Sequence, residues 1–234
     1  PPMRLDEQKE MRELPLFATS HPEKVEGLLR SSFLQRFPAH VELVREGEPA
    51  DFLHLVVDGK VEVFSRYGNR ETTIAILTRH DSFILAAVLT DRPYLKSVRA
   101  LTSSRILMMP AELVRSTVES DPGFAYTLMM ELARSYRNVV KELKNQKLRS
   151  SLERLAAWLI RTDAELGGTG RFELPYEKKV LAARIGVAPE VLSRGFRSLV
   201  AYKVFVVGKV ISIGDREALE KLAGTNHLID DPNV

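Results

Sequence analysis

Cysteine is absent from this sequence of 234 residues. Without thiolate ligands the chain can form no disulfide, no cysteine-held zinc site and no cysteine-ligated iron–sulfur cluster. Long apolar runs are missing too, since no stretch approaches the roughly 18–20 uninterrupted apolar residues of a membrane span. No charged-then-apolar leader opens the chain. We therefore expect a cytoplasmic protein without a membrane partner.

Sequence signatures of catalysis are also missing. There is no Gly-rich phosphate loop, no Ser/His/Asp signature and no His-x-His or clustered ligand spacing of the kind that holds a metal in cupin-type barrels. An enzyme of the cupin type is the alternative that these missing patterns argue against. We expect neither catalysis nor a metal site.

The composition is that of an ordinary globular protein, with 44% hydrophobic and 28% charged residues, and the net charge is only +3. The basic residues are unevenly distributed. Between 171 and 209 there are three acidic residues and eight basic ones: Arg171, Lys178, Lys179, Arg184, Arg194, Arg197, Lys203 and Lys209. A local basic excess is typical of a nucleic-acid-binding surface, and a solvated surface of mixed charge is the alternative.

The first half of the chain changes from helical to extended patterns. Residues 3–37 favour short helices, while Pro1 and Pro2 are left out of the predicted domain. From 41 to about 109, short runs rich in Val, Leu and Phe alternate with turns at Asp58-Gly59 and Gly68-Asn69, and "SVRALTSSRILMM" resembles a further strand pair. Short strands at such spacing predict an antiparallel barrel or sandwich.

Helical periodicity begins at Pro110. A short helix is predicted over 111–119, and Asp121-Pro122 then opens a long helix, with Asp as its N-cap. A narrow apolar line on this helix predicts a seam between two subunits, the alternative being a single helix packed on its own core. The line comprises Phe124, Leu128, Leu132, Val139 and Leu143. The polar stretch 145–150 predicts a hinge, with Ser151 as a cap of the next helix.

The stretch from Lys178 to Leu199 has the pattern of a helix-turn-helix. Gly186 stands where a first helix ends in a left-handed residue, and Pro189 stands at the first turn of a second helix. The second helix has a buried face of Leu192, Phe196 and Leu199, and other faces that expose Glu190, Ser193, Arg194 and Arg197. The strands "VFVV" and "VISI", joined at Gly208-Lys209, predict a wing behind it.

These two regions resemble the CRP/FNR family of bacterial transcription regulators. The resemblance rests on "REGEPADFLHLVVDGKVEVF" in the strand region and on "KKVLAARIGVAPEVLSRGFRSL" in the helix-turn-helix, in the family's order along the chain. It implies an α+β fold with an antiparallel double-stranded β-barrel of jelly-roll type and a winged helix-turn-helix. The implied boundaries are an effector-sensing barrel over 3–120, a dimerisation helix and hinge over 121–148, a DNA-binding domain over 149–225 and a tail over 226–234.

The resemblance also implies how the protein works on double-stranded DNA. A homodimer would place two recognition helices in successive major grooves of a two-fold-symmetric operator. Base reading falls to Glu190, Ser193 and Arg194, with a half-site similar to TTGAT, and phosphate contacts fall to Lys178, Lys179, Arg197 and Lys209. RNA polymerase would be a further partner of an activator. The alternative is a ligand-sensing or protein-interaction module whose winged helix reads no bases.

The effector pocket departs from the family's cyclic-nucleotide cassette. Ile84 and Leu85 stand in place of Gly-Glu, and Lys96 followed by Ser97 stands in place of Arg-Ser, while Val139 and Val140 replace two hydroxyl residues of the long helix. Ile84 blocks close approach to a phosphate, Leu85 cannot accept from a ribose hydroxyl, and Lys96 offers a point charge instead of a fork. We predict that cyclic AMP and cyclic GMP do not bind at signalling concentrations. A small hydrophobic molecule, haem or no effector remains, with His40, His54 and His80 as candidate iron ligands.

Overall fold

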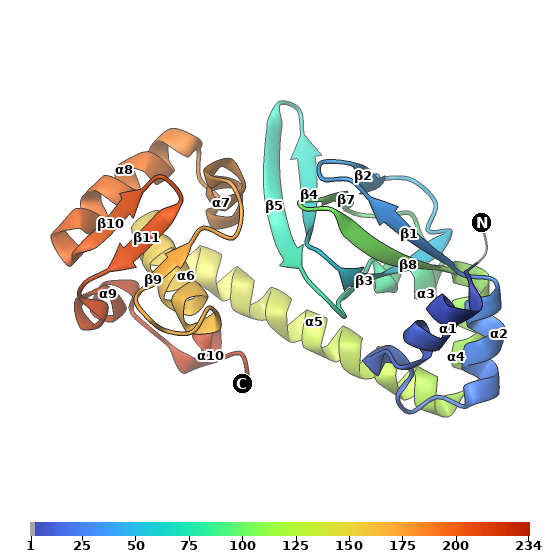
Figure 1. The fold of residues 1–234 in the computed structure, drawn as a ribbon. Helices are drawn as coiled ribbons and strands as arrows, with labels where there is room; N and C mark the ends of the chain where they lie inside the picture. Colours follow the sequence, from blue (N-terminus) through green and yellow to red (C-terminus); the bar gives the residue numbers. More distant parts are fainter. Residues whose placement is uncertain (1–2) are drawn as a thin grey trace. The chain divides into compact units, whose positions relative to one another are not determined.

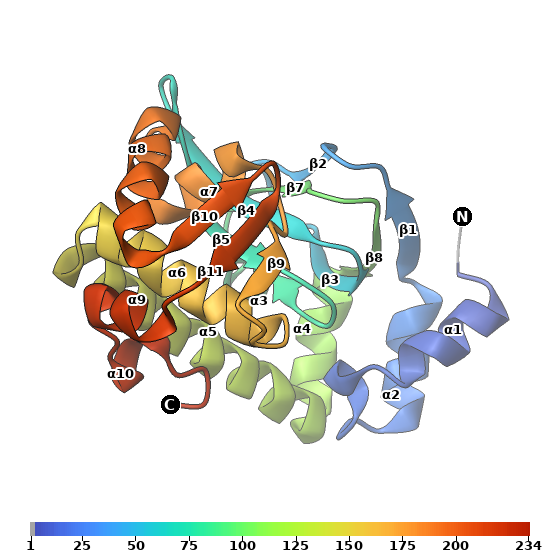
Figure 2. The same cartoon turned by 60° about the vertical axis from the view of Figure 1, so that its left-hand side comes forward.

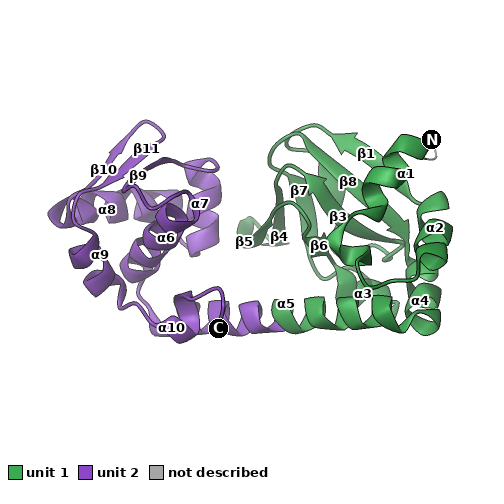
Figure 3. Cartoon of the chain, turned by 60° about the horizontal axis from the view of Figure 1, so that its bottom comes forward, with its two compact units in different colours: residues 1–135 green, residues 136–234 purple. Residues whose placement is uncertain are grey.

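The structure is a computed structural model that describes residues 3–234, so Pro1 and Pro2, left out of the predicted domain above, lie outside the described residues. Two compact units divide the chain, the first ending at Ser135 and the second beginning at Tyr136 (Figure 3). Helix α5 (Pro122–Leu148) runs from the first unit into the second, so its two halves belong to different units.

The first unit contains two antiparallel four-stranded sheets (Figure 1). One has the order β1 (Phe33–Phe37), β8 (Ser104–Pro110), β3 (Phe52–Asp58) and β6 (Ser82–Phe83). The other has the order β2 (Glu42–Val44), β7 (Ser97–Ala100), β4 (Val61–Tyr67) and β5 (Arg70–Leu77). Strands close in the sequence alternate between the sheets, as in a jelly roll, which confirms the predicted fold class.

Helices cover this barrel and connect its strands. The chain begins with α1 (Leu5–Arg12), the short 3-10 helix η1 (Pro15–Phe17) and α2 (Pro22–Arg30). Helix α3 (Leu85–Thr90) connects the two sheets, and α4 (Ala111–Ser120) follows β8. Helices α3 and α4 contact β3, and α2 contacts β8. The strand region therefore has a closed apolar core beneath its helices.

Two turns that were predicted to join paired strands instead join strands of different sheets. Asp58-Gly59 joins β3 to β4, but β3 pairs with β6 and β8 whereas β4 pairs with β5 and β7. The strands of "SVRALTSSRILMM" likewise belong to different sheets. Turn residues specify a change of direction and not a hydrogen-bonding partner, so a corner between sheets has the same signature as a hairpin. The turn at Gly68-Asn69 does join a hairpin, in which Tyr67 faces Arg70.

The start of α5 corrects the predicted subunit seam. The Asp121 carboxylate accepts hydrogen bonds from the N–H groups of Gly123 and Phe124 at 3.0 and 3.1 Å, which confirms the N-cap. Phe124 and Leu128 are 0% and 1% exposed in the core of the first unit, and the Phe124 ring stacks on Phe17. They hold α5 against its own barrel, and the partly buried Leu132 packs against the same core, so the predicted seam was wrong at these three positions.

The second unit is a winged helix. Its elements are α6 (Ser151–Glu165), β9 (Arg171–Glu173), α7 (Lys178–Ile185), α8 (Pro189–Leu199), the 3-10 helix η2 (Val200–Tyr202), β10 (Val204–Val207), β11 (Val210–Ile213), α9 (Arg216–Ala223) and α10 (His227–Asp230). The sheet order is β10-β11-β9. Ser150, and not the predicted Ser151, caps α6 by accepting from the Glu153 N–H. The segment expected to be a plain tail contains α10.

Candidate nucleic-acid interface and effector pocket

Helices α7 and α8 form the predicted helix-turn-helix. Gly186 ends α7 with φ 78°, the left-handed conformation that favours glycine, and its N–H bonds to the carbonyls at the end of α7. Pro189 begins α8 at a position where no backbone N–H is needed. The turn is therefore set by these two residues, as the sequence predicted.

Helix α8 presents one buried and one exposed face. Leu192, Phe196 and Leu199 are buried in the core of the second unit. The predicted DNA-reading residues Glu190, Ser193 and Arg194 are exposed together, and Arg197 is exposed with them. The Ser193 hydroxyl donates to the Pro189 carbonyl at 3.1 Å, so its oxygen can still accept from a ligand. A carboxylate, a hydroxyl and a guanidinium thus stand on a rigid helix.

Sequence reasoning missed the role of Gly195. A Cβ at this position would lie 3.0 Å from Leu155 Cδ2 and 3.9 Å from Leu152 Cδ1 on α6. The missing side chain lets α8 pack closely on α6. The signal was a glycine inside an amphipathic helix, next to the residues predicted to read DNA.

The basic residues of the second unit divide into paired and unpaired groups. Lys178, Lys179 and Lys209 are exposed, and like Arg197 they form no ion pair with any residue in 3–234. Arg184 differs, because its Nη1 lies 3.2 Å from Glu142 Oε2 on α5. It is therefore not one of the unpaired basic residues. Lys209 stands at the tip of the β10–β11 wing, where Val207 faces Val210, and β10 contacts α8 (Figure 2).

The altered cassette in the first unit has a backbone conformation that suits glycine. Ile84 has φ 67°, a left-handed conformation that a β-branched residue rarely adopts, and its side chain is buried. Leu85, buried beside it, begins α3. The position therefore keeps a geometry that suits glycine, while an apolar side chain fills the space that glycine would leave open.

Lys96 is the one cation of the altered cassette. It is half-buried, and desolvation lowers its pKa from the ordinary value. It forms no ion pair with any carboxylate in the described chain. The adjacent Ser97 is buried, and its hydroxyl accepts from the Glu46 N–H at 3.0 Å. Four of the residues predicted to line the effector pocket lie in the first unit, namely Ile84, Leu85, Lys96 and Ser97. The other two, Val139 and Val140, lie on the part of α5 that belongs to the second unit.

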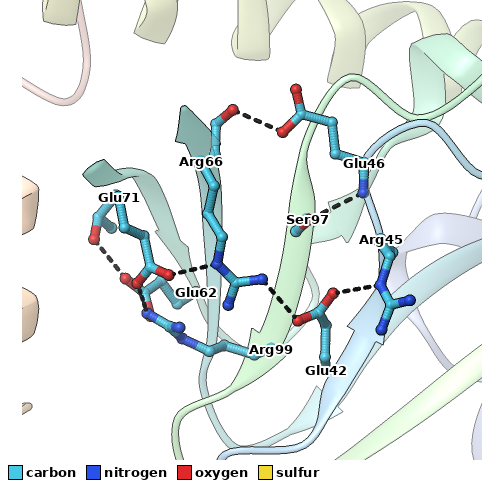
Figure 4. Close-up of polar contacts among 10 residues, drawn as sticks. Glu42, Arg45, Glu46, Glu62, Arg66, Glu71, Ser97 and Arg99 are labelled. Carbon is cyan, nitrogen blue, oxygen red and sulfur yellow. Dashed lines mark hydrogen bonds and ion pairs between the residues drawn. The ribbon is translucent and has the colours of Figure 1, made fainter. Parts of the chain in front are cut away.

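A polar network on the β2-β7-β4-β5 sheet was not predicted (Figure 4). Glu62 is 0% exposed, accepts from Arg99 Nε at 2.7 Å and also accepts from the Thr73 hydroxyl. The Arg99 guanidinium lies 4.2 Å from the ring centroid of Phe64. Arg66 joins Glu71 at 2.8 Å and Glu42 at 3.3 Å. Arg66 and Arg99 are both paired with carboxylates of the same sheet. The network therefore stabilises the sheet, and neither guanidinium is left free to bind an anion.

The three histidines considered as iron ligands lie in different surroundings. His40 and His80 are exposed, each with a positive φ. His54 is 3% exposed on β3, its ring stacked on Phe83 at 4.9 Å between centroids, and its Nδ1 has no hydrogen-bond partner. Burial lowers the pKa of His54 to about 4 and keeps the imidazole neutral. The buried Nδ1 of His54 is thus a neutral nitrogen without a hydrogen-bond partner, and no group of three or more metal-ligating side chains gathers within residues 3–234.

Helix α5 exposes an apolar stripe next to the predicted seam. Its large members are Tyr126, Met129, Met130, Tyr136, Val139, Val140 and Leu143, each at least 37% exposed. Positions 126, 129, 133, 136, 140 and 143 follow the alternating spacing of three and four that characterises a coiled-coil seam. Val139 and Leu143 of the predicted seam belong to this stripe, whereas Phe124, Leu128 and Leu132 pack in or against the barrel core.

Comparison with known proteins agrees with this architecture. The family model for the cyclic nucleotide-binding domain matches residues 34–121, and that for the Crp-like helix-turn-helix domain matches residues 153–222. The CRP-like cAMP-activated global transcriptional regulator of Mycobacterium tuberculosis is 24% identical over 89% of this chain and 96% of its own length. The Cyclic AMP receptor protein of Thermus thermophilus is 27% identical over 91% of this chain and 98% of its own.

A solved structure shows the same fold. FixK2 from Bradyrhizobium japonicum matches 83% of this chain and 98% of its own with a TM-score of 0.71 and 20% identity. In the described part of the chain, no helix has the length and apolar character needed to cross a membrane. Barrel, long helix and winged helix follow one another along the chain, and the residues predicted to read DNA are exposed. This chain belongs to the CRP/FNR family of transcription regulators, with a Crp-like helix-turn-helix for DNA binding.

Proposed function

We propose that this regulator reads a two-fold-symmetric operator with half-sites similar to TTGAT, as a homodimer. The observation that carries the proposal is the joint exposure of Glu190, Ser193 and Arg194 on α8, whose other face is buried. In a major groove Arg194 can donate two hydrogen bonds to a guanine edge, Glu190 can accept from a cytosine amino group, and Ser193 can bond a base or touch a thymine methyl. Lys178, Lys179, Arg197 and Lys209 are exposed in the same winged helix, form no ion pair with any described residue and suit phosphate contacts.

In this proposal the second copy of the chain packs against the exposed apolar stripe of α5. Large apolar side chains such as Tyr136 and Leu143, 71% and 53% exposed, gain stability when a second helix covers them. A spacing of three and four favours another long helix as that cover, because it keeps the stripe facing one partner. Two copies joined along α5 present two recognition helices, which matches a two-fold-symmetric operator.

The effector is proposed to be something other than a cyclic nucleotide. Names of the relatives refer to cyclic AMP, but Ile84 and Leu85 fill the cassette with apolar side chains and leave Lys96 as its one cation. Each missing charge-assisted hydrogen bond costs about 1.5–3 kcal/mol of binding free energy. The candidates are a small hydrophobic molecule, haem held through His54, or no effector. As an activator the dimer would also contact RNA polymerase.

Calorimetric titration and mass spectrometry test the effector assignment. We expect no binding of cyclic AMP or cyclic GMP at micromolar concentration, and a micromolar Kd for either would contradict the proposal. Mass spectrometry and an absorption spectrum of freshly purified protein would reveal a hydrophobic ligand or haem. Loss of a haem spectrum in His54→Leu, but not in His80→Asn, would assign the iron ligand.

Fluorescence anisotropy with labelled duplexes tests the DNA assignment. The probe is the palindrome TTGAT-N4-ATCAA, titrated alongside versions changed at one base pair of each half-site. Arg194→Ala should weaken binding by about 1–3 kcal/mol per half-site and relax the preference at one base pair. Lys209→Ala is the control, because loss of a phosphate contact weakens all sequences alike. Binding without sequence preference in the unchanged protein would favour the interaction-module alternative.

A further inference from the structure

Residues 224–234 fold back within the second unit and include a short helix. Gly224 ends α9 with φ 57°, and the chain then enters the short helix α10. The Asn226 side chain caps α10 by accepting from the Leu228 N–H at 2.9 Å, and Ile229 is 7% exposed. The segment contains a capped helical turn and buries an apolar side chain.

Arg149 joins this segment to the connection between α5 and α6. Its side chain is 5% exposed, and its two terminal nitrogens donate to the two carboxylate oxygens of Asp230 at 2.8 and 2.6 Å. The same guanidinium donates to the Gly224 carbonyl at 3.0 Å and to Asn145 Oδ1 at 3.2 Å. A two-pronged pair of this kind fixes direction as well as distance.

A second contact lies two turns earlier on α5. Lys141 Nζ donates to the Asp231 carbonyl at 2.7 Å. The segment is thus held at two positions, by Lys141 on α5 and by Arg149 just after the end of α5, and it is covalently continuous with α9 of the winged helix. The pair between Arg184 and Glu142 joins α7 to the same turns of α5. The polar hinge predicted at 145–150 is therefore spanned by two contacts to α5, one from α7 and one from the segment after α9.

We propose that residues 224–234 act as a clasp, which holds the winged helix in one orientation on the last turns of α5, with Arg149 as the positioning residue and Asp230 as its partner. Reorientation about 145–150 would separate the Arg149 guanidinium from Asp230 and the Gly224 carbonyl, leaving a buried cation without its partners. The clasp therefore favours one of the two states that a switching regulator needs. Its effect on DNA reading rests on the proposed function, since the orientation sets the separation of the two recognition helices.

Hydrogen exchange of the full chain without DNA tests the clasp directly. Asp230→Asn keeps the shape of the side chain but removes its charge, so exchange in peptides covering 141–152 should become about tenfold faster as the hinge opens more often. Asp231→Asn is the matched control, because the Asp231 carboxylate accepts from the Asn233 N–H and its backbone carbonyl, not its carboxylate, meets Lys141. Arg149→Lys, which keeps the charge but loses the fork, should follow Asp230→Asn. Unchanged exchange in both would overturn the proposal.

DNA binding gives a second readout that separates the two proposals. The unchanged protein should prefer one spacing among palindromes with N3, N4 and N5 between half-sites, and Asp230→Asn should reduce that preference about tenfold at similar fold content by circular dichroism. If the unchanged protein binds no operator, the proposed function fails, while the exchange rates still decide the clasp. If spacing preference persists in Asp230→Asn and Arg149→Lys with unchanged exchange, the clasp fails alone.

Discussion

The imidazole of His54 makes the stability of the barrel depend on pH. Its pKa in the folded chain is about 4, below the ordinary 6.5, because burial disfavours the cation. Between those values the unfolded chain binds a proton that the folded chain does not, so the free energy of unfolding falls as the pH falls through this window. From pH 7 to pH 5 we expect a loss of about 2 kcal/mol from this group.

Urea unfolding at pH 7 and pH 5 measures this loss. His54→Leu should remove this loss. The free energies of unfolding of the variant at pH 7 and pH 5 should then differ only by what the other titrating groups contribute. His80→Asn is the control, since His80 is exposed with φ 75°, a conformation that asparagine tolerates. If His54→Leu keeps the full pH dependence of the unchanged chain, the assignment to His54 is wrong.

Gly59 is required by the corner between the two sheets. It has φ 93°, and a Cβ there would lie 2.3 Å from Ser104 Oγ and 2.7 Å from the Ser103 carbonyl oxygen. Gly59→Ala should lower the free energy of unfolding by about 3 kcal/mol or more, because backbone atoms must shift. Gly68→Ala, also at positive φ but in open space, should cost about 1 kcal/mol. Equal melting temperatures for the two variants would contradict this account.

At the scale of elements, sequence patterns predicted the helices better than their environments. The limits of α7 and α8 and the exposure of Arg194 followed from local signals, namely Gly186, Pro189 and a strongly one-sided apolar face. Helix α5 carries apolar residues on two faces, so periodicity alone could not tell which face the barrel covers. Phe124 and Leu128 are spaced by four residues and Tyr126 and Met129 by three, and either spacing places two apolar side chains on one helix face. Only the fold shows that the first pair is buried in the core and that the second pair belongs to the exposed stripe.

The buried network around Glu62 illustrates the same limit. Glu62 stands between Val61 and Val63, as a solvent-facing residue of an alternating strand would. Its burial comes from Arg99 on the neighbouring strand β7 and Thr73 on β5, distant in the sequence. Pairing between strands such as β4 and β7, which are separated in the chain but adjacent in the sheet, decides such contacts and leaves no local signal in residue order.

The exposed stripe of α5 predicts where a charge would separate two subunits. Tyr136→Glu would place a carboxylate at a seam position of both helices, where burial and like-charge repulsion oppose association. We expect the dissociation constant of the dimer to rise by about 100-fold or more in sedimentation velocity. Asn138→Glu adds the same charge two residues on, at an exposed position off the stripe, and should leave the dimer intact. Identical sedimentation of both variants would contradict the seam.

For the whole molecule, the position of charge matters more than its total. The net charge is +3, yet the unpaired cations proposed to meet phosphates gather in the second unit. Each phosphate contact contributes about 0.9 to the slope of log affinity against log salt concentration. Replacing Lys178, Lys179 and Lys209 by alanine removes three contacts per subunit, so the slope for the dimer should become shallower by about 5.

A triple substitution in the first unit separates specific contacts from net charge. Lys9, Lys24 and Arg70 are exposed and form no ion pair with any residue in 3–234, so replacing them by alanine changes the net charge equally. This control should keep the salt slope of the unchanged protein, because these residues lie outside the winged helix. If both triple variants shift the slope alike, attraction depends on overall charge and the phosphate assignment fails. If only the winged-helix variant shifts it, while Arg194→Ala alone alters base preference, positioning and reading are separate tasks on one surface.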